Sequence, residues 1–313
     1  MSTTHEATES GTLLQPPVEI RSKWIGVATM FTGATSNQAG AGIGAHAFAA
    51  IDPAGVVAVR QVVAAAVLLP IAWPPLRRMT GSQWWPTLLL AAVFAVMNLS
   101  LYTAIDRLGL ALAVTLEFLG PLAVALAASR SRTDLLTAAA AAIGVYVLVL
   151  PGPSSDYLGL AVGIAAGACW GAYIILNRVV GARLPGLQAP ATAAGICALG
   201  YLPALAALAA DGRLQALPLL YAVTAGLLSS VVPYAADLTA LRYVPPRFFG
   251  VFMSTNPVMA ALSGLALLGQ VLALHEWLGI ALVVAANAVA VAGATPSSQR
   301  RPKEAPARLP TRE

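Results

Sequence analysis

The chain has 313 residues, of which 58% are hydrophobic and only 10% are charged, and its mean hydropathy is +0.76. Soluble domains carry roughly 25% charged residues, so this composition excludes a soluble globular protein. The pI of about 9.5 does not indicate a nucleic-acid partner, because the cations are dispersed and form no basic stripe with interleaved aromatic residues. We therefore expect a protein that lies in the lipid bilayer and binds no nucleic acid.

Apolar segments of about 20 residues follow one another along most of the chain, and about 20 helical residues are needed to cross a hydrocarbon core. The segments lack the alternating pattern of barrel strands, so we expect helices. The expected spans are residues 24–46, 54–75, 84–105, 108–129, 133–151, 158–178, 188–209, 217–241, 247–268 and 275–295. The predicted fold is an all-α membrane protein with ten transmembrane helices.

The Lys and Arg residues lie almost entirely in every second gap between these segments. With a cytoplasmic N-terminus, fifteen of the 18 cations fall on the cytoplasmic side, Arg107 and Arg213 fall on the opposite side, and Arg60 lies within a span. Cytoplasmic loops of membrane proteins are enriched in Lys and Arg. We therefore expect a multi-pass protein of the cell (plasma or inner) membrane with both termini in the cytoplasm.

The two ends of the chain differ from the apolar segments. Residues 1–23 contain three Glu and two adjacent Pro without an apolar core, so we expect that they are not a cleavable signal peptide. Residues 296–313 are rich in Pro and charge. We expect both tails to be disordered and cytoplasmic. Cys169 and Cys197 lie inside apolar segments and are interpreted as small packing residues.

An internal repeat relates the two halves of the apolar region. Shifting the chain by 136 residues aligns Pro121 with Pro257 and Thr103 with Thr239 without a gap. Each half, residues 24–151 and residues 158–295, would then hold five helices. An odd number of helices makes the second half enter the membrane from the opposite side, so we expect an inverted repeat, an architecture that recurs in secondary transporters.

Three stretches carry a family resemblance: Leu116 to Leu126 (LEFLGPLAVAL), Gly167 to Ile174 (GACWGAYI) and Phe249 to Ala261 (FGVFMSTNPVMAA). They resemble the drug/metabolite transporter superfamily with two EamA-type repeats, and more closely its threonine and homoserine exporter branch. The resemblance extends over residues 24–294. It implies ten helices, with helices one to four and six to nine around a central cavity and helices five and ten outside.

One position departs from the family pattern. The family commonly has Gly-Glu after the ninth helix, where this chain has Gly269 and Gln270. If the family uses that acid for coupling or for closing an outer gate, this protein differs there.

Three ionisable residues fall inside the predicted spans: Arg60, Glu117 and Asp237. A charge at the membrane centre costs about 3 kcal/mol on insertion scales, so each is a candidate functional group. Arg60 and Glu117 lie at similar depth, which allows an ion pair and leaves open a purely structural tie between helices. Asp237 lies near the inner end of its helix, where an interfacial role is easier.

Polar and aromatic residues at matching depth complete the candidate site, although core packing is an alternative for each. Asn98 and Tyr102 share one helix face, as do Trp170 and Tyr173. Gln38 precedes a glycine-rich stretch that allows its helix to bend or to pack closely. The candidate substrate and proton-pathway residues are Gln38, Arg60, Asn98, Tyr102, Glu117, Trp170, Tyr173, Tyr234 and Asn256.

No sequence feature points to catalysis. The chain has no phosphate-binding loop, no His/Cys/carboxylate cluster with metal-ligand spacing and no nucleophile motif. His46 and His275 lie at predicted helix ends, where an interfacial imidazole is the usual explanation. We therefore expect no enzyme, no cofactor, no metal and no catalytic residue.

The function that we expect is that of a secondary transporter that exports a small polar metabolite by alternating access. A mid-membrane carboxylate such as Glu117 can carry a proton, because its protonated form crosses the membrane neutral. The family resemblance alone narrows the substrate to amino acids of the threonine and homoserine type. Export of drugs, purines or other metabolites is the alternative, and a receptor or membrane enzyme is disfavoured. The sequence leaves open the direction of transport and the oligomeric state.

Overall fold

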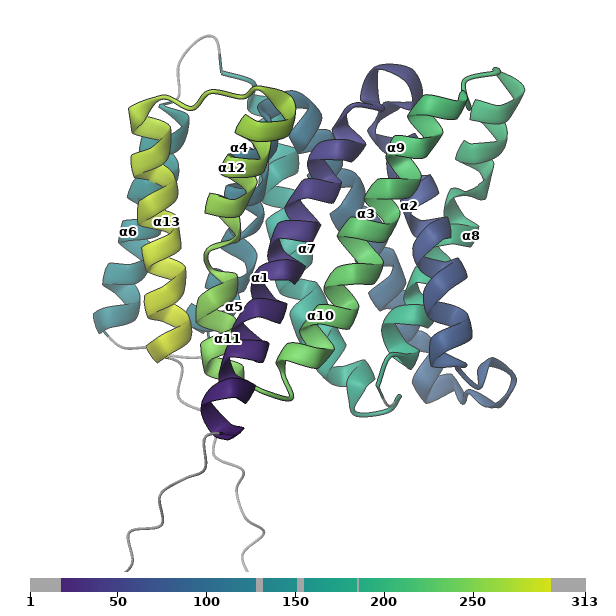
Figure 1. Ribbon diagram of the computed structural model, residues 1–313, viewed down its shortest axis with the longest axis horizontal. Coiled ribbons are helices and arrows are strands. Elements are labelled where there is room, and N and C mark those ends of the chain that lie inside the picture. The colour runs from purple at the N-terminus through teal and green to yellow at the C-terminus, as the bar shows by residue number, and fades with distance from the viewer. Residues whose placement is uncertain (1–17, 128–131, 151–154, 185, 294–313) are drawn as a thin grey trace, which may run out of the picture.

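The structure is a computed structural model that describes residues 18–127, 132–150, 155–184 and 186–293. All regular elements in these ranges are helices (Figure 1). The first half contains α1 (Val18–Ala45), α2 (Phe48–Ala72), η1 (Leu76–Arg78), α3 (Gly81–Leu108), α4 (Leu110–Glu117), α5 (Leu119–Ala127) and α6 (Arg132–Val149). The second half contains α7 (Tyr157–Gly181), α8 (Gln188–Ala210), α9 (Ala216–Gly226), the π-helical segment η2 (Leu227–Val231), α10 (Val232–Ala240), α11 (Pro246–Met253), α12 (Asn256–Leu268) and α13 (Leu274–Gly293).

Every predicted span coincides with one helix or with helices in direct succession. Within the described residues, eight helical stretches are long and apolar enough to cross a membrane, and α6 adds the shorter apolar stretch Leu135–Val149. α1 is less apolar because Thr, Ser, Asn and Gln residues interrupt it. α1 begins at Val18 and not at Trp24, while the predicted tail residues 1–17 and 296–313 lie outside the described residues.

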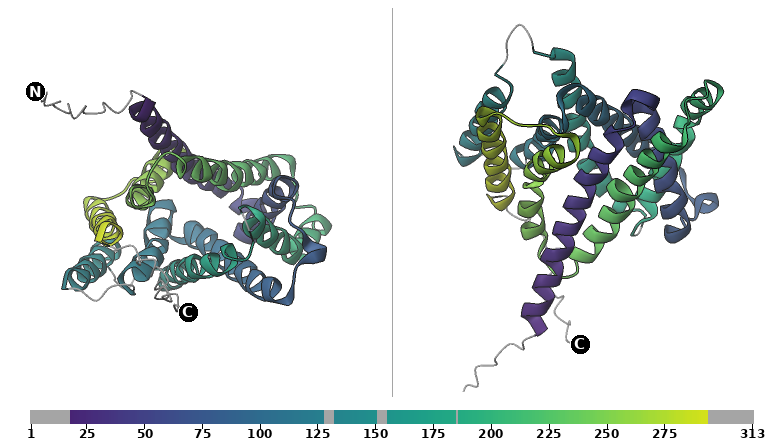
Figure 2. Two further views of the ribbon diagram at one scale, coloured as in Figure 1. Left: turned by 90° about the horizontal axis from the view of Figure 1, so that it is seen from below. Right: turned by 45° about the horizontal axis from the view of Figure 1, so that its top comes forward.

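The helices run up and down between two faces of the molecule (Figure 1). α1 begins and α13 ends at the lower face, whereas the turns from α1 to α2 and from α12 to α13 lie at the upper face. α6 packs on α13 at one side and α2 packs on α8 at the other, and α1 packs on α10 and α3 on α7 between them. Figure 2 shows this arrangement along the helices.

Three of the predicted spans are interrupted, where the sequence predicted continuous helices. The span 108–129 breaks at Phe118 between α4 and α5, and the span 247–268 breaks between Met253 and Asn256. Proline follows both breaks, at Pro121 and at Pro257, and proline is a common cause of helix kinks. The span 217–241 contains η2, whose wider turn leaves backbone carbonyls free for other partners.

The largest apolar cluster lies toward the upper face. It includes Phe48 and Ile51 at the start of α2, Ile105 at the end of α3, and Leu110 at the start of α4. These side chains are at most 7% exposed. The helices are thus packed closely on the upper side of the molecule.

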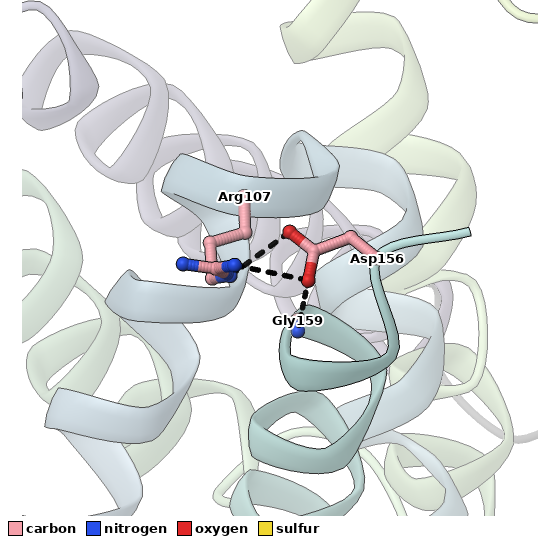
Figure 3. Close-up of polar contacts among 3 residues, drawn as sticks. All are labelled: Arg107, Asp156 and Gly159. Atoms are coloured by element: carbon pink, nitrogen blue, oxygen red, sulfur yellow. Dashed lines mark hydrogen bonds and ion pairs between the residues drawn. The ribbon is translucent and has the colours of Figure 1, made fainter. Parts of the chain in front are cut away.

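Two ion pairs lie at this upper face. Arg107 Nε lies 2.9 Å from Asp156 Oδ2, and Asp156 Oδ1 also accepts from Gly159 N at 2.8 Å, which caps α7 (Figure 3). Arg213 Nη2 lies 2.8 Å from Asp52 Oδ2. Arg107 and Arg213 are the two cations that the predicted topology assigns to the non-cytoplasmic side. An acid of the same face therefore neutralises each of them.

Candidate functional site

Two adjoining cavities lie in the middle of the helical domain. The first has a volume of about 170 Å³ and the second of about 370 Å³. Six residues line both: Asn37, Gln38, Glu117, Trp170, Pro233 and Asp237. The cavities therefore meet where α1, α4, α7 and α10 approach one another.

The nine candidate residues all line these cavities. Asn256 lines the second cavity, and the first is lined by the other eight: Gln38, Arg60, Asn98, Tyr102, Glu117, Trp170, Tyr173 and Tyr234. They come from both halves of the chain, and their spacing along each helix turns them to the same side. Their roles in transport stay predictions.

Arg60 is held by the π-helical segment. Its side chain is 8% exposed, its Nε donates to Ser230 Oγ at 3.0 Å, and its Nη2 donates to the Ser229 carbonyl at 2.9 Å. The guanidinium carbon lies 5.2 Å from the centre of the Tyr102 ring, a cation–π distance. The π turn frees the Ser229 carbonyl from the helical hydrogen-bond pattern, so this neutral acceptor can bind the guanidinium.

The ion pair that the similar depths of Arg60 and Glu117 allowed is not formed. Among the described residues, the pairs within 4.0 Å are those of Arg107 and Arg213 at the upper face. Ser229 and Ser230 take the place of the expected acid beside Arg60. In the described part of the chain, no carboxylate therefore lies within ion-pair distance of this guanidinium at the wall of the first cavity.

Glu117 is the last residue of α4 and stands at the helix break. Its side chain is 7% exposed, and no described residue forms a hydrogen bond or an ion pair with its carboxylate. It lines both cavities. This carboxyl group is thus open to a proton or to a cationic ligand that enters from either cavity.

An amide pair joins α1 to the second helix break. Gln38 Nε2 donates to Asn256 Oδ1 at 3.1 Å, and Asn256 Nδ2 donates to the Met253 carbonyl at 2.8 Å. The Met253 carbonyl lies at the end of α11, where the helix no longer supplies a backbone donor. Asn256 thus satisfies the broken backbone and ties it to α1.

Some polar groups near the site have no partner. Among the described residues, Tyr102 Oη and Asp237 Oδ1 are buried without a hydrogen-bond partner, and both residues line the first cavity. Both amide atoms of Gln61 are also buried and unpartnered, although Gln61 lines neither cavity. An unpaired buried polar group costs about 1–3 kcal/mol, so Tyr102 Oη and Asp237 Oδ1 favour polar contents in the first cavity.

Sequence reasoning missed Ser229 and Ser230, and it ranked Asp237 below Glu117. A signal was available, since two adjacent serines stand out in a mostly apolar span. The π turn that directs them toward Arg60 has no comparable signature in one sequence.

Comparisons with known proteins agree with this architecture. The sequence profile of the EamA-like transporter family matches residues 157–292. The threonine/homoserine exporter RhtA of Salmonella typhimurium (strain SL1344) is 33% identical over 288 residues, which cover 90% of this chain and 94% of the exporter. The chain belongs to the EamA-like transporter family.

Two further relatives and one solved structure are similar to this chain over most of its length. The threonine/homoserine exporter RhtA of Escherichia coli (strain K12) is 33% identical over 88% of this chain and 93% of its own length. The uncharacterized transporter YwfM of Bacillus subtilis (strain 168) is 25% identical over 85% of this chain and 91% of its own length. A solved crystal structure shares the fold, with a TM-score of 0.54 and 18% identity over 87% of this chain and 96% of that chain.

Family membership settles the general class. The protein is a multi-pass membrane transporter for a small-molecule substrate and not an enzyme. The candidate site agrees, because a cavity between helices from both halves of the chain is where transporters of repeated architecture bind substrate.

Proposed function

We propose that this protein is a secondary transporter that exports amino acids of the threonine and homoserine type across the cell membrane by alternating access. The observation that carries the proposal is the mid-membrane cavity with charges of both signs. Arg60 supplies a fixed cation, and Glu117 and Asp237 supply two carboxyl groups. The similarity to threonine/homoserine exporters over nearly the whole chain supports the substrate class.

The chemistry of the cavity fits a zwitterion. A substrate carboxylate would bind the guanidinium of Arg60. The Ser229 and Ser230 contacts use Nε and Nη2, and Nη1 forms no hydrogen bond with a described residue. The ammonium group would lie toward Glu117 and Asp237. The amides of Gln38 and Asn256 line the second cavity, which would bind the polar side chain of the substrate. A ligand without both charges would leave one pole of the site unpaired, at a free-energy cost.

We also infer that the transporter has ten membrane-spanning helices in two inverted repeats, residues 24–151 and 158–295. In support, the shift of 136 residues carries the break at Phe118 onto Ser254, which lies within the second break. The packing of α1 on α10 has a counterpart in that of α7 on α3, as an exchange of the halves requires. Both termini would be cytoplasmic, with residues 1–23 and 296–313 as cytoplasmic tails.

Cysteine labelling tests the orientation. Single cysteines at Gly81 and at Ser155, each in a background without Cys169 and Cys197, should react from the cytoplasmic side and from the outside respectively. A membrane-impermeant maleimide on intact cells distinguishes the two. Labelling of position 81 from outside would overturn the proposed orientation, and with it the assignment of both termini to the cytoplasm.

Transport itself is tested with purified protein in liposomes. Counterflow of labelled threonine and homoserine, with leucine, a purine and a cationic dye as competitors, ranks the substrates directly. We expect threonine and homoserine to exchange and Arg60→Gln to abolish the exchange. Exchange of the purine or the dye, with no response to threonine, would instead support the alternative of drug or metabolite export.

A further inference from the structure

An apolar groove lies on the outside of the bundle, apart from the two central cavities. Its volume is about 560 Å³, and it runs between α2 and α8. Small side chains such as Ala65, Ala66 and Ala198 form much of its wall, and Leu69 and Leu199 complete it. Its one side-chain hydroxyl, on Thr192, donates to the Gln188 carbonyl of its own helix at 2.7 Å. The groove thus offers an apolar ligand no polar group that needs a partner.

The lower end of the groove meets a cationic turn. Leu76 and Trp84 line this end, and Leu76 is followed directly by Arg77 and Arg78 of η1. Both arginines are exposed, and neither forms an ion pair with a described residue. Trp73, close to the same end, is 81% exposed, as is typical of tryptophans at the membrane interface.

We propose that this groove is a binding site for an anionic phospholipid, with an acyl chain between α2 and α8 and the phosphate head group at Arg77 and Arg78. The charges and the apolar wall match the two parts of such a molecule. A cation near the membrane surface contributes about 1 kcal/mol toward anionic lipid, so two arginines give about a 30-fold preference over a zwitterionic lipid. The proposal is independent of the transported substrate.

The test compares phosphatidylglycerol with phosphatidylcholine of identical acyl chains, added to the purified full chain in detergent. Native mass spectrometry counts the retained lipids, and thermal unfolding reports their effect on stability. We expect phosphatidylglycerol to be retained preferentially and to raise the Tm more than phosphatidylcholine. The double variant Arg77→Gln with Arg78→Gln should lose this preference.

Matched variants separate the groove from a general attraction to the cationic face. Arg178→Gln with Arg242→Gln removes two exposed cations elsewhere on that face and should leave the preference intact. Ala66→Phe fills the groove and should reduce retention of both lipids, whereas Ala281→Phe on α13 should not. An unchanged preference in the Arg77/Arg78 variant would overturn the proposal. So would a stable dimer in solution that Ala66→Phe dissociates, since a second copy of the chain would then occupy the groove.

Discussion

The helix break at Phe118 and the one between Met253 and Asn256 present different side chains to the cavities. At the first break, Glu117 presents to the cavities a carboxyl group that no described residue bonds, and α7 packs against the break through glycine. At the second break, Asn256 is neutral and bonded to both Gln38 and Met253. One break thus exposes an ionisable group, while amides lock the other. The two halves therefore share a helix break at matching positions but differ in the side chain that each break presents.

The largest effect is expected at the glycine contact of the first break. A Cβ on Gly120 would overlap the Gly167 carbonyl and lie 2.9 Å from the backbone nitrogen of Gly171. Because backbone cannot move aside as a side chain can, Gly120→Ala should destabilise the protein by roughly 3 kcal/mol, the upper range for overpacking. Thermal unfolding and the folded fraction on size exclusion measure this.

Two glycines provide the comparison. A Cβ at Gly200 on α8 would lie within 4 Å of no described atom beyond its own helix backbone, so Gly200→Ala should be neutral or slightly stabilising. Gly250 lies beside the second break, and among the described residues a Cβ there would meet the Val291 side chain and no backbone of another helix. Gly250→Ala should therefore cost less than Gly120→Ala. Equal losses at Gly120 and Gly250 would contradict the difference between the two breaks.

The next effect concerns Glu117 and the driving force. Glu117→Gln mimics the protonated carboxyl group, so substrate counterflow should persist while accumulation driven by a pH gradient falls to the level of empty liposomes. Folded yield should stay near that of the wild type, because no ion pair with Arg60 is lost. Continued uphill transport by the variant under an imposed pH difference would exclude Glu117 as the proton carrier.

A moderate effect is expected at the second break. Asn256→Ala removes the bond to Gln38 and leaves the Met253 carbonyl without its side-chain partner, which should cost about 1–3 kcal/mol. A double-mutant cycle with Gln38→Ala isolates the bridge, and its coupling energy should be about 1 kcal/mol. Additive effects of the two substitutions would show that the amide pair does not lock the break.

The smallest effect is expected at Asp156. The Gly159 amide and the Arg107 guanidinium hold the pKa of Asp156 below its ordinary value of 3.8. Its charge therefore stabilises the fold at neutral pH, and this contribution disappears as the pH falls through the lowered pKa. The Tm of Asp156→Asn should lie slightly below that of the wild type at pH 7, and the difference should vanish at acidic pH. A difference that persists there would assign it to packing.

Much of the architecture could be predicted because lipid constrains sequence strongly. A helix must satisfy its own backbone in hydrocarbon, so each predicted span has its helix. A polar group in lipid is costly, and the nine candidate residues within the spans line the central cavities. What stayed hidden depends on tertiary contacts. Pro121 and Pro257 mark the neighbourhood of the two breaks but do not fix their positions at Phe118 and before Asn256. The π turn at Leu227–Val231 bonds to Arg60 and Asn37, which lie far along the chain. Arg60 illustrates the limit: its depth was predicted, but its serine partners were not.

The close approach of α5 and α7 has a mechanical consequence. Where two helices touch backbone to backbone at Gly120 and Gly167, no side chain is present that could change rotamer and let them slide. We expect them to turn about this point as a fulcrum. Displacement then grows with distance from it, so the helix ends at both faces travel farthest. Glu117 and Trp170, each three residues from the fulcrum, would keep nearly the same separation while access to them alternates.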